Sequence, residues 1–425
     1  MFEMNEKHKE LFIRKSSRTA ASYLRRIKEL SDDIESVSPF LEALKKIYVD
    51  FEPVHSCDDI LVGTLCALIP NELIYAAGAK PVRLCSGSYT AYSVGDDAVP
   101  RDACPLTKAI MGFVETQSLP IYKDCSLLAV PVTCDCKKKL AGLLGEYMPT
   151  IILQVPSDKV SDDAVSRYSE ELYRLVRELE RVTGNTVTRQ SLLGGIQTVG
   201  RAQYEMSRFA EYRKHTPALI HGTHTMAVMN AYSYLSADTW ADLMSELNDE
   251  LEERKQKGIF AEKDKNPRIM VTGSPIAFPN MKIPLLIEEM GGILAADETC
   301  MGERGIYDPT VVIDTSFDSM MRALANRYIR PCTCPVFSDN RQRLYRIKQM
   351  IKTHQIQGVI YHVLRGCLVY DYEYTIMEEE LEKLDIPIIR VESDYNEEDV
   401  EQLRVRIEAF IELIKLKNLK NSKKR

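Results

Sequence analysis

The chain has 425 residues, of which 45% are hydrophobic and 28% charged, proportions typical of a globular protein with two or three domains. Its formal net charge of -7 at pH 7 provides no basic surface, so we expect no nucleic-acid partner. The chain has no apolar run near the roughly 18 residues that a membrane-spanning helix needs, and its charged first residues lack the apolar core of a secretory signal. These features predict a cytoplasmic protein with no membrane partner.

The first part of the chain is predicted to be a helical segment, residues 1–51, because apolar residues such as Leu24, Ile27 and Leu30 recur at helical spacing. Residues 52–157 are predicted to form a first α/β domain, since short β-rich runs alternate with helical ones. The expected elements are a strand at 59–65, a helix at 71–77, strands at 80–84 and 127–133, a helix at 137–147 and a strand at 150–155.

The second half of the chain repeats this alternation after a helical region at residues 158–265. Residues 266–425 are predicted to form a second α/β domain. Expected strands lie at 268–272, 293–296, 358–364 and 386–391, with helices at 282–290, 377–384 and 403–415. The predicted fold class is therefore α/β, with two Rossmann-like parallel-sheet domains, a helical N-terminus, a helical insertion between the domains and a cleft between them.

Cysteine residues follow the predicted strands, with Cys66, Cys85, Cys134 and Cys367 each placed just after one. In open α/β sheets, ligands bind outside the carboxyl ends of the strands. Eleven cysteines in a reducing compartment favour metal or redox use over disulfides. We therefore expect a soft metal centre, most plausibly an iron–sulfur cluster.

Further cysteines stand in loops that suit this role. Cys104 precedes Pro105 and a helix, whose N-terminus favours a thiolate. Cys332 and Cys334 lie between prolines in a stiff loop, and Cys300 lies in a loop after another strand. The alternative is that each cysteine is a small core residue, and we assign Cys57, Cys85 and Cys125 to that structural class. Structural zinc is the competing metal, but its usual spacers are two to four residues, whereas here they contain one.

Several catalytic motifs are missing from the sequence. It contains no Gly-x-x-x-x-Gly-Lys-Ser/Thr loop for ATP and no Gly-x-Gly-x-x-Gly after a strand for a dinucleotide. His221 and His224 could act as acid/base groups or contact substrate, but we interpret them as a hydrogen-bonded structural pair. Glu298 and Glu303 could be proton-transfer groups, but we interpret them as solvated surface residues. No catalytic residue is assigned from the sequence.

The chain resembles the 2-hydroxyacyl-CoA dehydratase and benzoyl-CoA reductase superfamily. The segments that carry the likeness are Cys66–Leu84, Pro100–Lys108, Thr133–Lys139, Thr272–Pro275, Arg365–Cys367 and Ile386–Glu392. The resemblance implies a two-domain α/β fold, anaerobic metabolism, and a [4Fe–4S] cluster held by Cys66, Cys104 and Cys367. It also implies a separate ATP-hydrolysing iron–sulfur activator as electron donor, and a homodimer or a heterodimer with a related subunit.

The additional cysteines are similar to those of a second branch, the double-cubane cluster proteins, which reduce small molecules. This likeness implies six ligands for an [8Fe–9S] cluster: Cys66, Cys104, Cys134, Cys300, Cys334 and Cys367, with Cys332 able to replace Cys334. Single and double cubane both remain open. We therefore expect either a dehydratase-like lyase component or an iron–sulfur reductase, and the non-catalytic alternative is a metal-binding scaffold.

Overall fold

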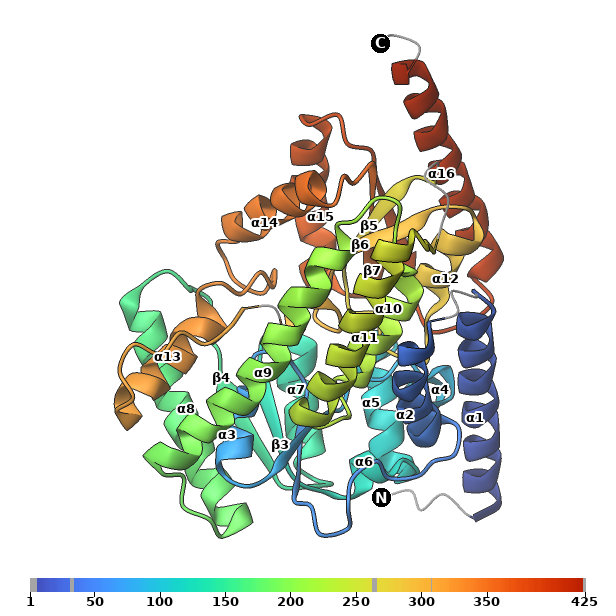
Figure 1. The fold of residues 1–425 in the computed structure, drawn as a ribbon. Helices are drawn as coiled ribbons and strands as arrows, with labels where there is room; N and C mark the ends of the chain where they lie inside the picture. Colours follow the sequence, from blue (N-terminus) through green and yellow to red (C-terminus); the bar gives the residue numbers. More distant parts are fainter. Residues whose placement is uncertain (1–5, 31–33, 262–265, 307, 423–425) are drawn as a thin grey trace.

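The structure is a computed structural model that describes residues 6–30, 34–261, 266–306 and 308–422 (Figure 1). Two four-stranded sheets lie at its centre, and all their strand pairs are parallel. The first sheet has the order β2-β1-β3-β4 and the second has the equivalent order β6-β5-β7-β8. The predicted α/β class with two parallel sheets and a helical N-terminus is confirmed.

The first sheet is covered by helices on both faces, as parallel strands require. Its strands are β1 (Leu61–Thr64), β2 (Lys80–Arg83), β3 (Cys125–Val132) and β4 (Thr150–Gln154). The helices of this part are α1 (Glu6–Glu29), α2 (Ser38–Tyr48), α3 (Asn71–Ala76), α4 (Tyr89–Gly95), α5 (Pro105–Thr116), α6 (Pro120–Lys123) and α7 (Asp135–Leu144).

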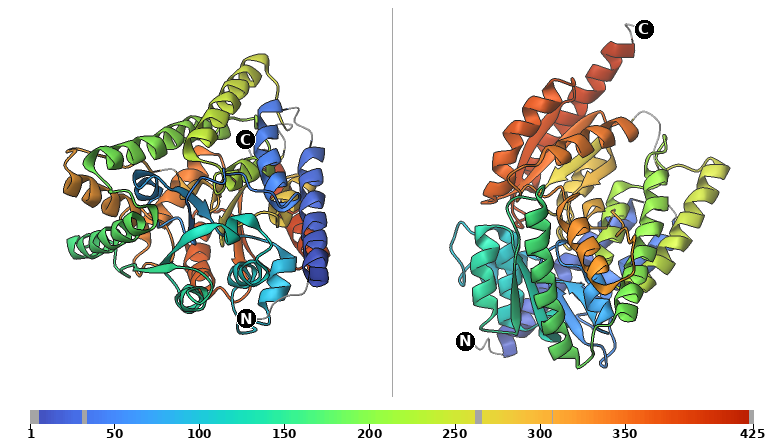
Figure 2. Two further views of the ribbon diagram at one scale, coloured as in Figure 1. Left: turned by 90° about the horizontal axis from the view of Figure 1, so that it is seen from below. Right: turned by 90° about the vertical axis from the view of Figure 1, so that its left-hand side faces the viewer.

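The helical region between the two sheets forms part of the layers around them. It contains α8 (Asp162–Thr183), α9 (Arg189–Arg213), α10 (Gly222–Ala231) and α11 (Ala237–Lys257). The apolar side of α8, with Tyr168 and Leu172, is buried in one core with Leu127 of β3 and Leu153 of β4. Helix α10 contacts α12 and β6 of the second sheet. These four helices therefore reach both sheets (Figure 2).

The second sheet consists of β5 (Arg268–Gly273), β6 (Ile293–Glu298), β7 (Gly358–Leu364) and β8 (Ile388–Ser393). Its part of the chain contains the helices α12 (Lys282–Glu289), α13 (Phe317–Ile329), α14 (Arg341–Thr353), α15 (Leu368–Glu382) and α16 (Val400–Ser422). Helix α13 contacts α8, and its Met320, Met321 and Leu324 are buried in the core of the first sheet. After β6 the chain therefore returns to the first sheet before it forms β7. The division into four segments made from the sequence stays a prediction.

Two features concern the surface of the molecule. The C-terminal end of α16 projects away from the rest of the chain (Figure 1 and Figure 2, right). Within the described residues, none of the helices combines the length and the apolar character that crossing a bilayer requires.

Candidate functional site

A cavity of about 210 Å³ lies where loops after the strands of both sheets meet. Its wall is mainly apolar and contains nine cysteines: Cys66, Cys85, Cys104, Cys134, Cys136, Cys300, Cys332, Cys334 and Cys367. The seven cysteines predicted as ligands are thus all brought to one cavity. Cys57 is exposed elsewhere, and Cys125 is buried in β3 with its Sγ donating to the Ile121 carbonyl oxygen over 3.0 Å.

Three of these cysteines occupy the same position at the start of a helix. Cys104, Cys134 and Cys367 are the N-cap residues of α5, α7 and α15. The unpaired amides of a first helical turn carry partial positive charge, which stabilises a nearby thiolate. Cys66 and Cys300 each stand two residues after a strand, β1 and β6. The strand-end placement seen in the sequence therefore has a geometric basis.

The loops that carry Cys104 and Cys367 touch each other. The two thiols are hydrogen bonded, and this bond lowers the pKa of Cys367 to about 7 while it raises the pKa of Cys104, which burial raises further. Gly366 permits this approach, because its φ is +75° and a Cβ there would lie 2.5 Å from the Asp102 carbonyl oxygen. An L-amino acid with a side chain would be both strained and in collision.

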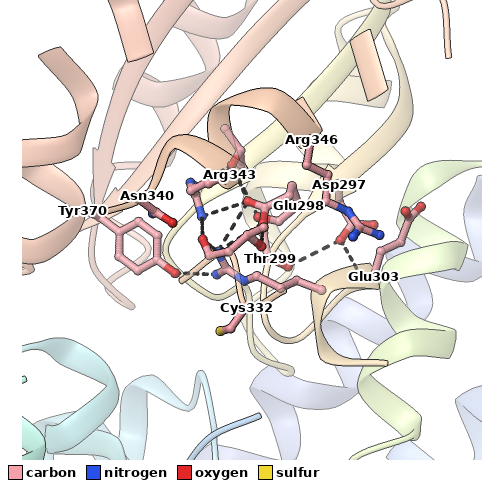
Figure 3. Close-up of polar contacts among 12 residues, drawn as sticks. Asp297, Glu298, Thr299, Glu303, Cys332, Asn340, Arg343, Arg346 and Tyr370 are labelled. Atoms are coloured by element: carbon pink, nitrogen blue, oxygen red, sulfur yellow. Dashed lines mark hydrogen bonds and ion pairs between the residues drawn. The ribbon is translucent and has the colours of Figure 1, made fainter. Parts of the chain in front are cut away.

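The Cys332-Thr333-Cys334 loop is held by a buried polar network (Figure 3). The Thr333 carbonyl oxygen accepts from Arg304 Nη1 over 3.3 Å and from Arg343 Nη1 over 3.1 Å. The Thr333 hydroxyl donates to Glu298 Oε1 over 2.6 Å. Glu298 in turn pairs with both arginines. The Cys332 sulfur points away from this network in Figure 3. The network therefore holds the loop backbone without using this sulfur.

Two carboxylates beside Cys300 have a structural role. Glu298 is fully buried among its arginines, and Glu303 is 6% exposed and pairs with Arg213, which also lies 2.9 Å from Asp297. The interpretation of Glu298 and Glu303 as solvated surface residues is therefore wrong. Two of their partners, Arg213 and Arg343, come from helices far along the chain, so the local sequence contains no sign of these pairs.

Cations surround the cysteines inside the cavity. Arg83 Nη1 donates to the Cys300 carbonyl oxygen over 2.9 Å, and Lys137 Nζ donates to Thr133 Oγ1 over 3.0 Å. Burial alone would raise the pKa of Cys66, but Lys137, an amide hydrogen bond and Arg83 outweigh it, so this pKa lies below its ordinary value. The thiolate form of Cys66 is accordingly favoured, which is the form that binds metal.

Burial dominates at other thiols of the cavity. It raises the pKa of Cys85 to about 12 and raises the pKa values of Cys134, Cys332 and Cys334. These thiols are neutral at pH 7 unless a metal displaces their protons. Among the described residues, no group of three or more His, Cys, Asp or Glu side chains is arranged to hold a metal ion.

The histidine pair lies outside the cavity. His224 Nε2 is 2.9 Å from the Ile27 carbonyl oxygen, and His221 Nδ1 is 3.5 Å from Glu288. Glu288 also accepts from the Gly222 and Thr223 amides at the start of α10. These contacts agree with the interpretation of the pair as structural.

Comparison with known proteins assigns the chain to a family. The model of the family described as 2-hydroxyglutaryl-CoA dehydratase, D-component, matches residues 66–414. The chain belongs to this family. The match begins at Cys66 and spans all seven candidate cysteines, whereas α1 and α2 precede it.

Curated relatives of this D-component family chain are dehydratase subunits by name. An Escherichia coli (strain K12) protein named "Putative dehydratase subunit YjiM" is 30% identical over 357 residues, which cover 83% of this chain and 91% of the relative. The (R)-phenyllactyl-CoA dehydratase beta subunit of Clostridium sporogenes is 24% identical, and the (R)-2-hydroxyglutaryl-CoA dehydratase subunit beta of Acidaminococcus fermentans is 23% identical, with the same coverage. The resemblance stated from the motifs is thereby confirmed.

Proposed function

We propose that this D-component family chain is the iron–sulfur component of a two-part redox system. It accepts low-potential electrons from a separate ATP-hydrolysing iron–sulfur activator and uses them for a radical dehydration of the 2-hydroxyacyl-CoA type or a related reduction. The observation that carries the proposal is that all seven candidate cysteines line one cavity at the carboxyl ends of both sheets. The names of the relatives support a dehydratase subunit.

The donors present fit a cluster. Thiolates are the usual ligands of iron–sulfur clusters, and such a cluster brings its own sulfides and several irons. Several cysteines of the cavity wall would hold such a cluster together, and nine cysteines line this cavity. Cys66, Cys104 and Cys367 would hold a [4Fe–4S] cluster, and the cluster would supply one-electron chemistry at low potential.

The remaining residues of the cavity hold and shield this site. The Thr333 network fixes one cysteine loop, and Gly366 lets the loops of Cys104 and Cys367 meet. The mainly apolar wall, which includes Leu65 and Leu364, would limit the access of water to the thiols. Water exclusion protects reactive redox states and strengthens the local electrostatics.

Two kinds of partner are proposed, an ATP-hydrolysing activator and a second dehydratase subunit. The sequence has no P-loop, so ATP hydrolysis would belong to the activator. Two relatives are beta subunits by name, which supports assembly with a related subunit or a second copy of the chain. Electron transfer from the activator to this chain is likewise proposed.

A second candidate function is a double-cubane reductase of small molecules. It is favoured by the grouping of the cysteines into two sets. Cys104, Cys134 and Cys367 are close enough to affect one another electrostatically, and so are Cys66, Cys332 and Cys334. Two sets of three thiolates would suit an [8Fe–9S] cluster, for which Cys300 offers a further ligand. A single cubane would need only one set.

The test is metal analysis of protein purified without oxygen, with the EPR spectrum after reduction. We expect about four irons per chain for one cubane or about eight for two, with matching sulfide. C104S and C367S should lose iron, whereas C57S, which alters an exposed cysteine outside the cavity, should retain it. Zinc in place of iron, or full iron in both cavity variants, would refute the proposal.

A further inference from the structure

Lys137 and Arg304 are two cations of the cavity wall that differ in their surroundings. Arg304 is neutralised by Glu298, whereas Lys137 donates to the neutral Thr133 hydroxyl. Within the described part of the chain, Lys137 forms no ion pair with a carboxylate, and its ionisable neighbours are the thiols of Cys66, Cys134, Cys334 and Cys85. Lys137 is half-buried in the cavity wall, where an ammonium group without a counter-anion is costly, so its place implies an anion that the cysteines help to provide.

The position of Lys137 relative to the two sets of cysteines is the second observation. It lies in the first turn of α7 and lines the cavity. Cys134, the N-cap of this helix, belongs to one set, and Cys66 and Cys334 belong to the other. The ammonium group of Lys137 therefore interacts electrostatically with cysteines of both sets.

We propose that Lys137 is a positioning residue whose ammonium group compensates the negative charge of the thiolate-bound cluster and raises its reduction potential. The inference rests on the proposed iron–sulfur function. Reduction adds one electron from the activator to the cluster and breaks no bond, so the reduced form carries one more negative charge. A fixed positive charge inside a poorly polarisable cavity stabilises that form more than the oxidised one.

The neighbouring lysines provide a matched control. Lys138 and Lys139 follow directly on the same helix, and both are exposed. A charge in water is screened, so its removal should leave the cluster nearly unaffected. The three residues share one sequence neighbourhood and differ in whether they face the cavity.

The experiment compares wild type, K137M, K137R and K138M, each purified anaerobically and titrated with a chemical reductant while EPR follows the cluster. We expect the midpoint potential of K137M to shift to more negative values, with K137R near wild type and K138M unchanged. Iron and sulfide content are measured on the same samples.

Each contrary outcome is distinct. An unshifted potential in K137M, or an equal shift in K137M and K138M, would overturn the charge-compensation role. Equal loss of iron in K137M and K137R would show a packing role for the lysine and would also overturn it. Absence of iron and sulfide from the wild type would refute the proposed function itself, and this inference with it.

Discussion

Substitution of Gly366 by alanine should separate the loops of Cys104 and Cys367. Its positive φ of +75° costs an alanine about 1–2 kcal/mol, because an L-residue is unfavourable in this conformation. In addition, the new Cβ would lie 2.5 Å from the Asp102 carbonyl oxygen, whereas 3.4 Å is an ordinary contact. The loops must therefore move apart by about 1 Å, well beyond the roughly 0.2 Å that metal–ligand distances tolerate.

Gly184 provides the control for backbone strain. It caps α8 with a similar φ of +71°, and a Cβ there would meet nothing within 4 Å. We expect G184A to lose only the stability that corresponds to the unfavourable backbone conformation, and to keep its iron. G366A should show a larger drop in the urea midpoint of the metal-free chain and should also lose iron in anaerobic preparations. Equal midpoints for the two variants together with full iron in G366A would refute the reasoning.

Three further predictions concern stability and ligand choice. R343M should lower the free energy of unfolding by about 3–5 kcal/mol, measured by thermal unfolding, because it leaves Glu298 and Glu373 without a buried partner. R341M alters a side chain that is 88% exposed and should change this free energy by less than about 0.5 kcal/mol. Similar losses in the two variants would contradict the buried-pair argument. Burial lowers the pKa of His354 to about 4 in the folded chain, against 6.5 in the unfolded chain, so the unfolded state binds more protons between these two pH values. The free energy of unfolding should therefore fall by roughly 3 kcal/mol as the pH decreases through this window. H354N should flatten this pH dependence in urea titrations, and an unchanged pH dependence would contradict the prediction. For a double cubane, C134S should lose iron while C136S retains it, as iron assays on both variants would show. The reverse result would mean that the wrong member of the pair was assigned.

Strands could be predicted from the sequence where their own residues form a continuous apolar run. The run at 358–364 coincides with β7, because its residues other than His362 are apolar or small and all of them are buried. By contrast, β6 extends past the expected Ala296 to Glu298. Its charged end pairs with Arg213 of α9 and Arg343 of α14, and no local pattern reveals partners from such distant helices.

Helices with exposed apolar residues were harder to predict. The helix expected at 377–384 begins at Leu368, as α15. Leu368, Tyr372 and Ile376 are largely exposed on it, so its pattern lacks the usual separation of apolar and polar faces. No element was predicted between 301 and 357, where α13 and α14 form.

The cysteines at the site could be predicted as a group, because strand ends converge in a parallel fold. The role of Lys137 could not, since the sequence Lys137-Lys138-Lys139 offers three equal candidates. Only the direction of α7 places the first of them against the cavity. Cys85 and Cys136 also line the cavity without having been predicted as ligands.

The equivalent order of the two sheets gives corresponding positions in the two halves of the chain. β2 corresponds to β6, so Cys85 and Cys300, each two residues past its strand, are counterparts. β3 corresponds to β7, which pairs Cys134 with Cys367. Such a pattern is what duplication of one ancestral four-stranded unit produces. On this view each half contributes its own strand-end cysteines, and the cavity lies where the strand ends of the two halves meet.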